Sequence, residues 1–146
     1  MTISQFINLA SMIWISHFIA DFVFQTRKMG ENKSTSLFWL SMHILTYFTV
    51  FLTLGLFYLQ PLLGWWHFIG YVIMNTLLHF ATDFITSKIT GYFYMKAESA
   101  KTQDIANEIK LSKARRAMKG FWTTIGFDQL VHCTTLIQTL KFYIPF

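Results

Sequence analysis

The chain has 146 residues, of which 53% are hydrophobic and 18% aromatic, and only 13% are charged. An ordinary soluble domain is about 25% charged, so this composition argues against a water-soluble fold and favours a bilayer. The length allows a single domain over residues 1–146, and the net charge of +5 is too localised along the chain to indicate nucleic acid, which we do not expect as a partner.

Four stretches of the chain are long and apolar enough to cross the hydrocarbon core of a membrane, which needs about 20 residues of helix. They cover approximately residues 5–26, 37–59, 65–87 and 121–142. We therefore predict an all-α fold, a polytopic bundle of about four transmembrane helices in contact with membrane lipid, whose oligomeric state stays open.

The loops between the predicted spans differ in charge. Residues 27–33 contain three basic residues and one acidic residue, whereas residues 60–64 contain neither kind. Residues 88–119 contain eight Lys or Arg against three Asp or Glu. The positive-inside rule then predicts that the first and third loops are cytoplasmic and that both termini lie on the other side of a bacterial inner membrane. Trp66 fits the aromatic belt of the outer interface and Trp39 that of the inner one.

The third loop, residues 88–120, is expected to contain a cytoplasmic amphipathic helix at about residues 97–119, because its apolar residues recur at helical spacing. Three interpretations of its charge stay open. The charges either only set the topology, or they bind anionic lipid or an acidic cytoplasmic partner through residues 96–119.

Three of the predicted spans carry a histidine and an aspartate four residues apart, which places both side chains on one helix face. The pairs are His17 with Asp21, His79 with Asp83, and, in reversed order, Asp128 with His132. The second span contributes His43. At 1.5 Å per residue, the aspartates and His43 fall about 7–11 Å inside the cytoplasmic boundary, and the other three histidines fall one turn deeper.

The reversed order in the fourth span is consistent with this layering, because that helix runs opposite to the first and third. An aspartate at the centre of a membrane helix costs roughly 2.5–3.5 kcal/mol to insert, and aspartates at one depth repel one another. No Lys or Arg lies deep in any predicted span. We therefore expect either protons or metal ions to compensate the carboxylates.

Imidazole and carboxylate groups are suitable ligands for Zn, Mn or Fe. Seven such groups exceed what one tetrahedral ion needs, so we predict a centre for one or two divalent metal ions, of the kind that helix bundles build from facing helices. The predicted ligands are His17, Asp21, His43, His79, Asp83, Asp128 and His132. A proton-coupled polar network is the alternative, and His67 at the opposite interface is expected to be structural.

Several motifs extend over nearly the whole chain: His17-x-x-x-Asp21-Phe22-x-x-Gln25, then Asn32-Lys33, His43, His79-x-x-x-Asp83 and Asp128-Gln129-x-x-His132. By these motifs the chain resembles a family of small bacterial and phage membrane proteins known as domain of unknown function 3307. The family name carries no activity. The resemblance therefore supports the site and not a particular reaction.

The leading functional hypothesis is a metal-dependent hydrolase that opens to the cytoplasm and acts on an amphipathic ester or phosphoester. Lys33 and Gln25 are its catalytic candidates: Lys33 would steady an anionic headgroup or developing charge, and Gln25 would orient a ligand, unless it only packs between helices. The alternatives are a metal or proton transporter, a haem or electron-transfer bundle, and a non-catalytic membrane protein that docks a partner through its basic loop.

Overall fold

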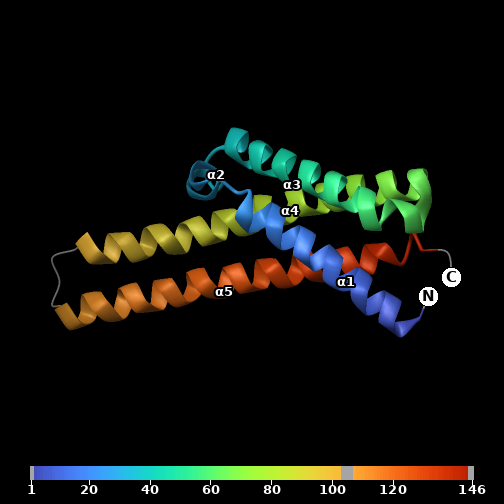
Figure 1. Ribbon diagram of the computed structural model, residues 1–146. Helices are drawn as coiled ribbons and strands as arrows, with labels where there is room; N and C mark the ends of the chain where they lie inside the picture. The colour runs from blue at the N-terminus through green and yellow to red at the C-terminus, as the bar shows by residue number, and fades with distance from the viewer. Residues whose placement is uncertain (1, 103–106, 145–146) are drawn as a thin grey trace.

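The computed structural model describes residues 2–102 and 107–144, and all the regular secondary structure in these residues is helical, as predicted (Figure 1). The elements in chain order are α1 (Ile3–Phe18), the π-helix η1 (Ile19–Val23), α2 (Arg27–Asn32), α3 (Leu37–Tyr58), α4 (Gln60–Thr102) and α5 (Asn107–Leu140). The start of α1 and the end of α5 lie at the same end of the molecule (Figure 1).

Three helical segments in the described part of the chain are long and apolar enough to cross a membrane: Ile3–Val23, Leu37–Tyr58 and Gln60–Lys101. They correspond to the first three predicted spans. Most of the predicted fourth span, residues 121–142, lies in α5, which ends at Leu140 and carries polar residues such as Gln129 along it. That span stays a prediction.

α4 is much longer than the span predicted within it. It begins at Gln60, is kinked at Gly64, where φ is +72°, and then continues to Thr102. Glycine suits this position because residues with a Cβ rarely adopt a positive φ. The kink turns the chain back after α3, so that α3 and α4 pack against each other as antiparallel neighbours.

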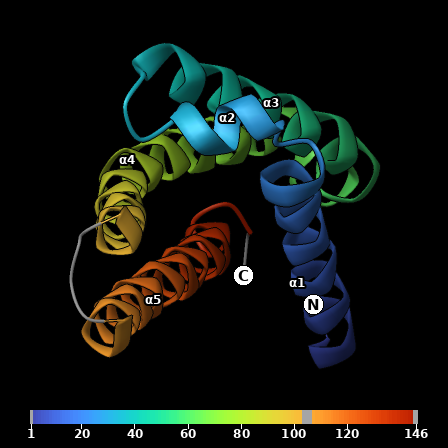
Figure 2. The ribbon, with the colours of Figure 1, turned by 90° about the vertical axis from the view of Figure 1, so that its left-hand side faces the viewer.

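The predicted cytoplasmic loop with its own amphipathic helix is replaced by extensions of two long helices. Residues 88–102 continue α4, residues 107–120 form the start of α5, and the two helices run side by side (Figures 1 and 2). Buried alanines explain the difference, because Ala97, Ala100, Ala114 and Ala117 let the helices approach closely. Residues 103–106, in the middle of the predicted loop, lie outside the described residues. We call the part of the bundle formed by residues 88–102 and 107–120 the basic end.

The hydrophobic core lies toward the opposite end of the bundle and joins α1, α3, α4 and α5. Its buried residues are Leu9, Ile13, Ala20, Tyr47, Phe51, Leu59, Leu63, Phe68, Tyr71, Val72, Leu136 and Leu140. The Tyr71 hydroxyl donates to the Leu136 carbonyl at 2.9 Å, so the one buried polar atom of that side chain is satisfied. The packing closes this end of the bundle, and the polar residues gather between it and the basic end.

Gly55 allows α3 to approach α4 within this core. A Cβ at position 55 would lie 2.7 Å from Cε2 of the fully buried Phe68. We expect Gly55→Ala to lower the free energy of unfolding by about 1–3 kcal/mol, the usual cost of overpacking, in unfolding titrations in mixed micelles. Gly126→Ala is the matched control, because no described atom lies within 4 Å of its Cβ position. An equal loss in both variants would contradict this account.

Candidate metal centre

All seven predicted metal ligands are buried, with at most 8% of any of them exposed. They come from four segments of the bundle: α1 with η1, α3, α4 and α5. Ion pairs, hydrogen bonds and ring contacts connect the seven residues into one cluster, which lies between the hydrophobic core and the basic end. The structure thus brings together the residues that periodicity and depth had selected, and their role as ligands stays a prediction.

Four of these residues form the first group of candidate ligands. One ligand atom from each of Asp21, His43, His79 and Asp83 lies within 4.8 Å of the others. The Nε2 atom of His43 is 3.0 Å from an oxygen of each aspartate, and the Nε2 atom of His79 is 3.4 Å from Asp21 Oδ1. Two imidazoles and two carboxylates converge on one point, as a tetrahedral divalent ion requires.

Asp83 also belongs to a second group, with Asp128 and His132. The Nε2 atom of His132 is 3.3 Å from Asp83 Oδ1 and 3.3 Å from Asp128 Oδ1. The two oxygens of Asp83 therefore face different groups, since Oδ2 faces His43 and Oδ1 faces His132. A carboxylate placed in this way can bridge two metal ions.

His17 lies outside both groups. Its Nε2 atom is 4.0 Å from Asp21 Oδ2 and donates to the side-chain oxygen of Gln129 at 3.1 Å. Its Nδ1 atom is buried without a hydrogen-bond partner among the described residues. The ring lies 5.1 Å from that of His132, between centroids. This position fits two roles for His17: a residue that supports the ligands through Gln129, or the metal ligand that the sequence predicts.

Asp21 is presented to the cluster by a local departure from the α-helix. Residues 19–23 form a π-helical turn, in which the N–H of Phe24 donates to the carbonyl of Ile19 at 3.0 Å. Single turns of π-helix occur frequently at functional sites, because the extra residue redirects the side chains that follow. The chain then reverses into α2, whose N-cap Thr26 accepts from the N–H of Met29 at 3.3 Å. This reversal leads Lys33 back toward the cluster.

Lys33 enters the cluster from outside the predicted spans. Its ammonium donates to Asp83 Oδ2 at 2.8 Å, and only 17% of its side chain is exposed. Burial lowers the pKa of the Lys33 ammonium, but Asp83 and Asp21 raise that pKa by more, so the group stays charged. The expectation that only protons or metal ions compensate the carboxylates is therefore wrong in part, because it considered only cations within the spans.

Two polar residues that sequence reasoning did not select complete the network. The side-chain nitrogen of Gln129 donates to Asp21 Oδ2 at 2.7 Å and to Asp128 Oδ2 at 3.1 Å. The hydroxyl of Thr86 donates to Asp128 Oδ1 at 2.5 Å. The sequence held a signal for each of them: Gln129 is part of the motif around Asp128, and Thr86 lies one turn beyond Asp83 on the same helix face.

Gln25, a predicted catalytic candidate, and Asn75, which lies one turn before His79 on α4, differ in their surroundings. The side-chain oxygen of Gln25 is buried without a hydrogen-bond partner among the described residues, and the residue lines the cavity described below. Asn75 donates to the Tyr71 carbonyl and accepts from the Thr139 hydroxyl, both at 2.9 Å. Asn75 therefore joins α4 to α5 and does not orient a ligand.

A cavity of about 910 Å³ leads from the three aspartates toward the basic end. Polar lining residues include Asp21, Asp83, Asp128, Gln129, Gln25, Lys33, Ser87, Lys88 and Thr90. Apolar and aromatic lining residues include Phe22, Tyr92, Tyr94, Met95, Phe121 and Ile125. The volume falls within the range of small-molecule sites. The buried ring of Tyr47 stacks on that of His79 with centroids 3.9 Å apart.

Comparison with known proteins supports the resemblance that the motifs indicate. The family described as "Protein of unknown function (DUF3307)" matches residues 9–145, which include every residue of the two ligand groups. No curated protein and no solved structure matches the chain.

Proposed function

The chain belongs to the DUF3307 family, whose description states no activity, and we propose that it is a membrane-embedded, metal-dependent hydrolase of an amphipathic ester or phosphoester. The observation that carries the proposal is the position of Asp83. It lies between two groups of buried ligands at the inner end of a cavity large enough for a small molecule. Metal pairs held in this way serve hydrolysis in many enzymes.

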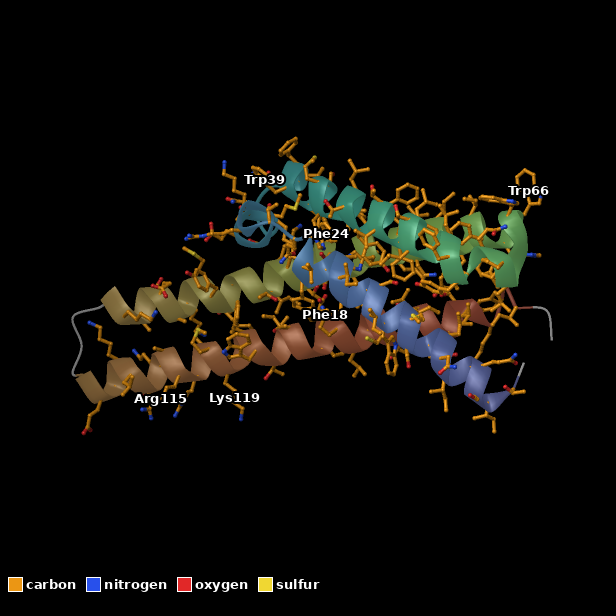
Figure 3. The ribbon with its side chains drawn as sticks, in the orientation of Figure 1. Phe18, Phe24, Trp39, Trp66, Arg115 and Lys119 are labelled. Carbon is orange, nitrogen blue, oxygen red and sulfur yellow. The ribbon has the colours of Figure 1, made fainter. Side chains whose placement is uncertain are left out.

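The proposal includes a fourth span at residues 121–142, a cytoplasmic basic end and a bacterial inner membrane. The burial of Asp128 and His132 supports the fourth span, because polar residues that face the bundle interior are shielded from lipid. Trp39 lies near the start of α3 and Trp66 at the far end of the bundle, a separation that fits two aromatic belts (Figure 3). The excess of Lys and Arg at the basic end supports the cytoplasmic assignment.

The charges of the cluster support a requirement for divalent cations. Three carboxylates and the single ammonium of Lys33 leave two negative charges when the histidines are neutral. One divalent ion would balance this charge, and a second would leave the site positive, which suits an anionic phosphoester. The donor set of imidazoles and carboxylates fits Zn, Mn or Fe. Such ions supply a water nucleophile at neutral pH and stabilise charge on the ester oxygens.

The residues around the ligands have distinct proposed roles. Gln129 holds the carboxylates of Asp21 and Asp128 in place, and His17 holds Gln129 in turn. Lys33 lines the cavity beside Asp83, where its ammonium can contact an anionic headgroup. The aromatic and aliphatic wall of the cavity suits the hydrocarbon part of an amphipathic substrate.

The test uses purified protein in lipid nanodiscs, stripped with a chelator and reloaded with Zn, Mn or Fe. Chromogenic long-chain phosphodiesters and carboxylic esters serve as substrates. We expect hydrolysis to depend on metal, to disappear in Asp21→Asn and to persist in His67→Gln, because His67 is exposed at the far end of the bundle. Protein that binds metal fully but hydrolyses neither ester class would rule out the hydrolase.

Transport of metal ions or protons is a second candidate, favoured by the chain of buried histidines. His79 and His132 are 3.1 Å apart, and His132 contacts Asp83 at 3.3 Å, an arrangement typical of proton relays. The packed hydrophobic core that contains Tyr47 and Phe51 argues against a path through the bundle, and for a site that opens only toward the basic end. Metal or proton flux into proteoliposomes that is lost in Asp83→Asn would favour transport.

A further inference from the structure

A second cavity lies between α4 and α5 at the basic end, separate from the metal centre. It has a volume of about 480 Å³ and is lined by Phe93, Lys96, Ser99, Ala100, Lys113, Arg116 and Ala117. We call it the basic cleft. Lys96 comes from α4, whereas Lys113 and Arg116 come from α5, where their spacing of three residues places them on one face. Two helices thus direct cationic side chains to one space.

The basic cleft concentrates positive charge. No Asp or Glu is among the described residues that line it. The nearby acid Glu98 pairs with Lys101 at 2.5 Å, and the ammonium of Lys96 donates to the hydroxyl of Tyr92 at 3.4 Å, which is a neutral partner. Three cations around one cavity repel one another, and a cavity of one charge sign attracts ions of the opposite sign.

The shape of the cleft suits a small anionic group. Buried Ala100 and Ala117 line it with short side chains that leave the space open. Phe93 also lines it and is accommodated by Gly120, where a Cβ would lie 2.6 Å from the ring. Arginine forms paired hydrogen bonds to phosphate oxygens, and lysine adds a point charge. We propose that the basic cleft binds a phosphate group, as a second site independent of the hydrolase function proposed above.

The depth of the cleft favours a soluble phosphate compound over a lipid headgroup. Lys96 lies eight residues beyond Lys88, or about 12 Å along the helix. The headgroup layer on one side of a bilayer is only roughly 5–8 Å thick. With Lys88 at the hydrocarbon boundary, the cleft faces water just beyond the headgroups. A long headgroup carries the same phosphate chemistry, so the experiment has an arm for each source.

The first arm measures binding of inorganic phosphate by calorimetry to the full chain in phosphatidylcholine nanodiscs. We expect Lys113→Gln with Arg116→Gln to weaken binding by about 10-fold or more, since charge-assisted hydrogen bonds to phosphate are lost. The matched control is Arg115→Gln with Lys119→Gln, which removes the same charge from the same helix. Figure 3 shows these two side chains pointing away from α4. We expect the control to bind phosphate like the unmodified chain.

The second arm repeats the titration in nanodiscs that contain phosphatidic acid. A lipid headgroup is the occupant if phosphatidic acid weakens the apparent binding of inorganic phosphate to the unmodified chain, while the Lys113/Arg116 variant binds phosphate equally in both lipids. Unchanged binding identifies a soluble one. Equal losses in both charge-removal pairs, or no phosphate binding in either lipid, would overturn the proposal. Metal content and circular dichroism of each variant establish that the bundle is folded, and Arg116→Lys alone should retain most of the binding.

Discussion

Replacing Asp83 with asparagine is expected to remove metal from both halves of the centre at once. The carboxylate supplies Oδ2 to the group around His43 and Oδ1 to the group around His132. An amide of nearly the same shape keeps one weak oxygen ligand and presents a nitrogen that does not coordinate. Loss of partners behind the ligands typically costs 10–100-fold in metal affinity, so loss of a shared ligand should cost roughly 100-fold or more. Elemental analysis and competition with a chromogenic chelator measure the effect.

Single replacements elsewhere in the centre make this prediction specific. Asp128→Asn should deplete only the group that contains His132 and leave the ion held by Asp21, His43 and His79. His67→Gln should leave the metal content unchanged. Metal content in Asp83→Asn equal to that of the unmodified chain would exclude the shared ligand. Identical losses in Asp83→Asn and Asp128→Asn would indicate one site and not two.

The second large effect is expected for Lys33→Met in chelator-treated protein. The substitution removes the ammonium that contacts Asp83 at 2.8 Å and leaves a carboxylate that is 1% exposed without its cation. Breaking one partner of a buried ion pair typically costs about 3–5 kcal/mol, because an uncompensated charge remains in a poorly polar environment. We expect a loss of this size in the free energy of unfolding, measured by denaturant titration in micelles.

A double-mutant cycle separates the ion pair from other effects of the substitution. Lys33→Met combined with Asp83→Asn removes both members of this ion pair, so the loss should be smaller than the sum of the two single losses. Lys28→Met is the control, because Lys28 is exposed on α2, the short helix whose C-cap is Lys33. Additive losses, or an equal loss in the control, would show that Lys33 does not stabilise the fold through Asp83.

The clustering of the predicted ligands could be foreseen from their positions along the chain. Histidine and aspartate four residues apart must share a helix face, and a bilayer aligns helices so that residues at equal distance from a boundary meet at one depth. These two rules need no knowledge of neighbouring helices. They selected His43 and the three pairs of histidine and aspartate, all of which are buried in one cluster. The three apolar spans followed from length and composition in the same way.

How these residues divide into groups, and what surrounds them, depends on the packing of the helices. The shared position of Asp83, the hydrogen bonds of Gln129 and the reach of Lys33 depend on the rotation of each helix about its axis and on the turn after η1. Those features arise from packing between segments distant in sequence, which local periodicity does not encode. The same reason explains the basic end: helical spacing at residues 97–119 was visible in the sequence, but the cleft arises only from the packing of α4 against α5.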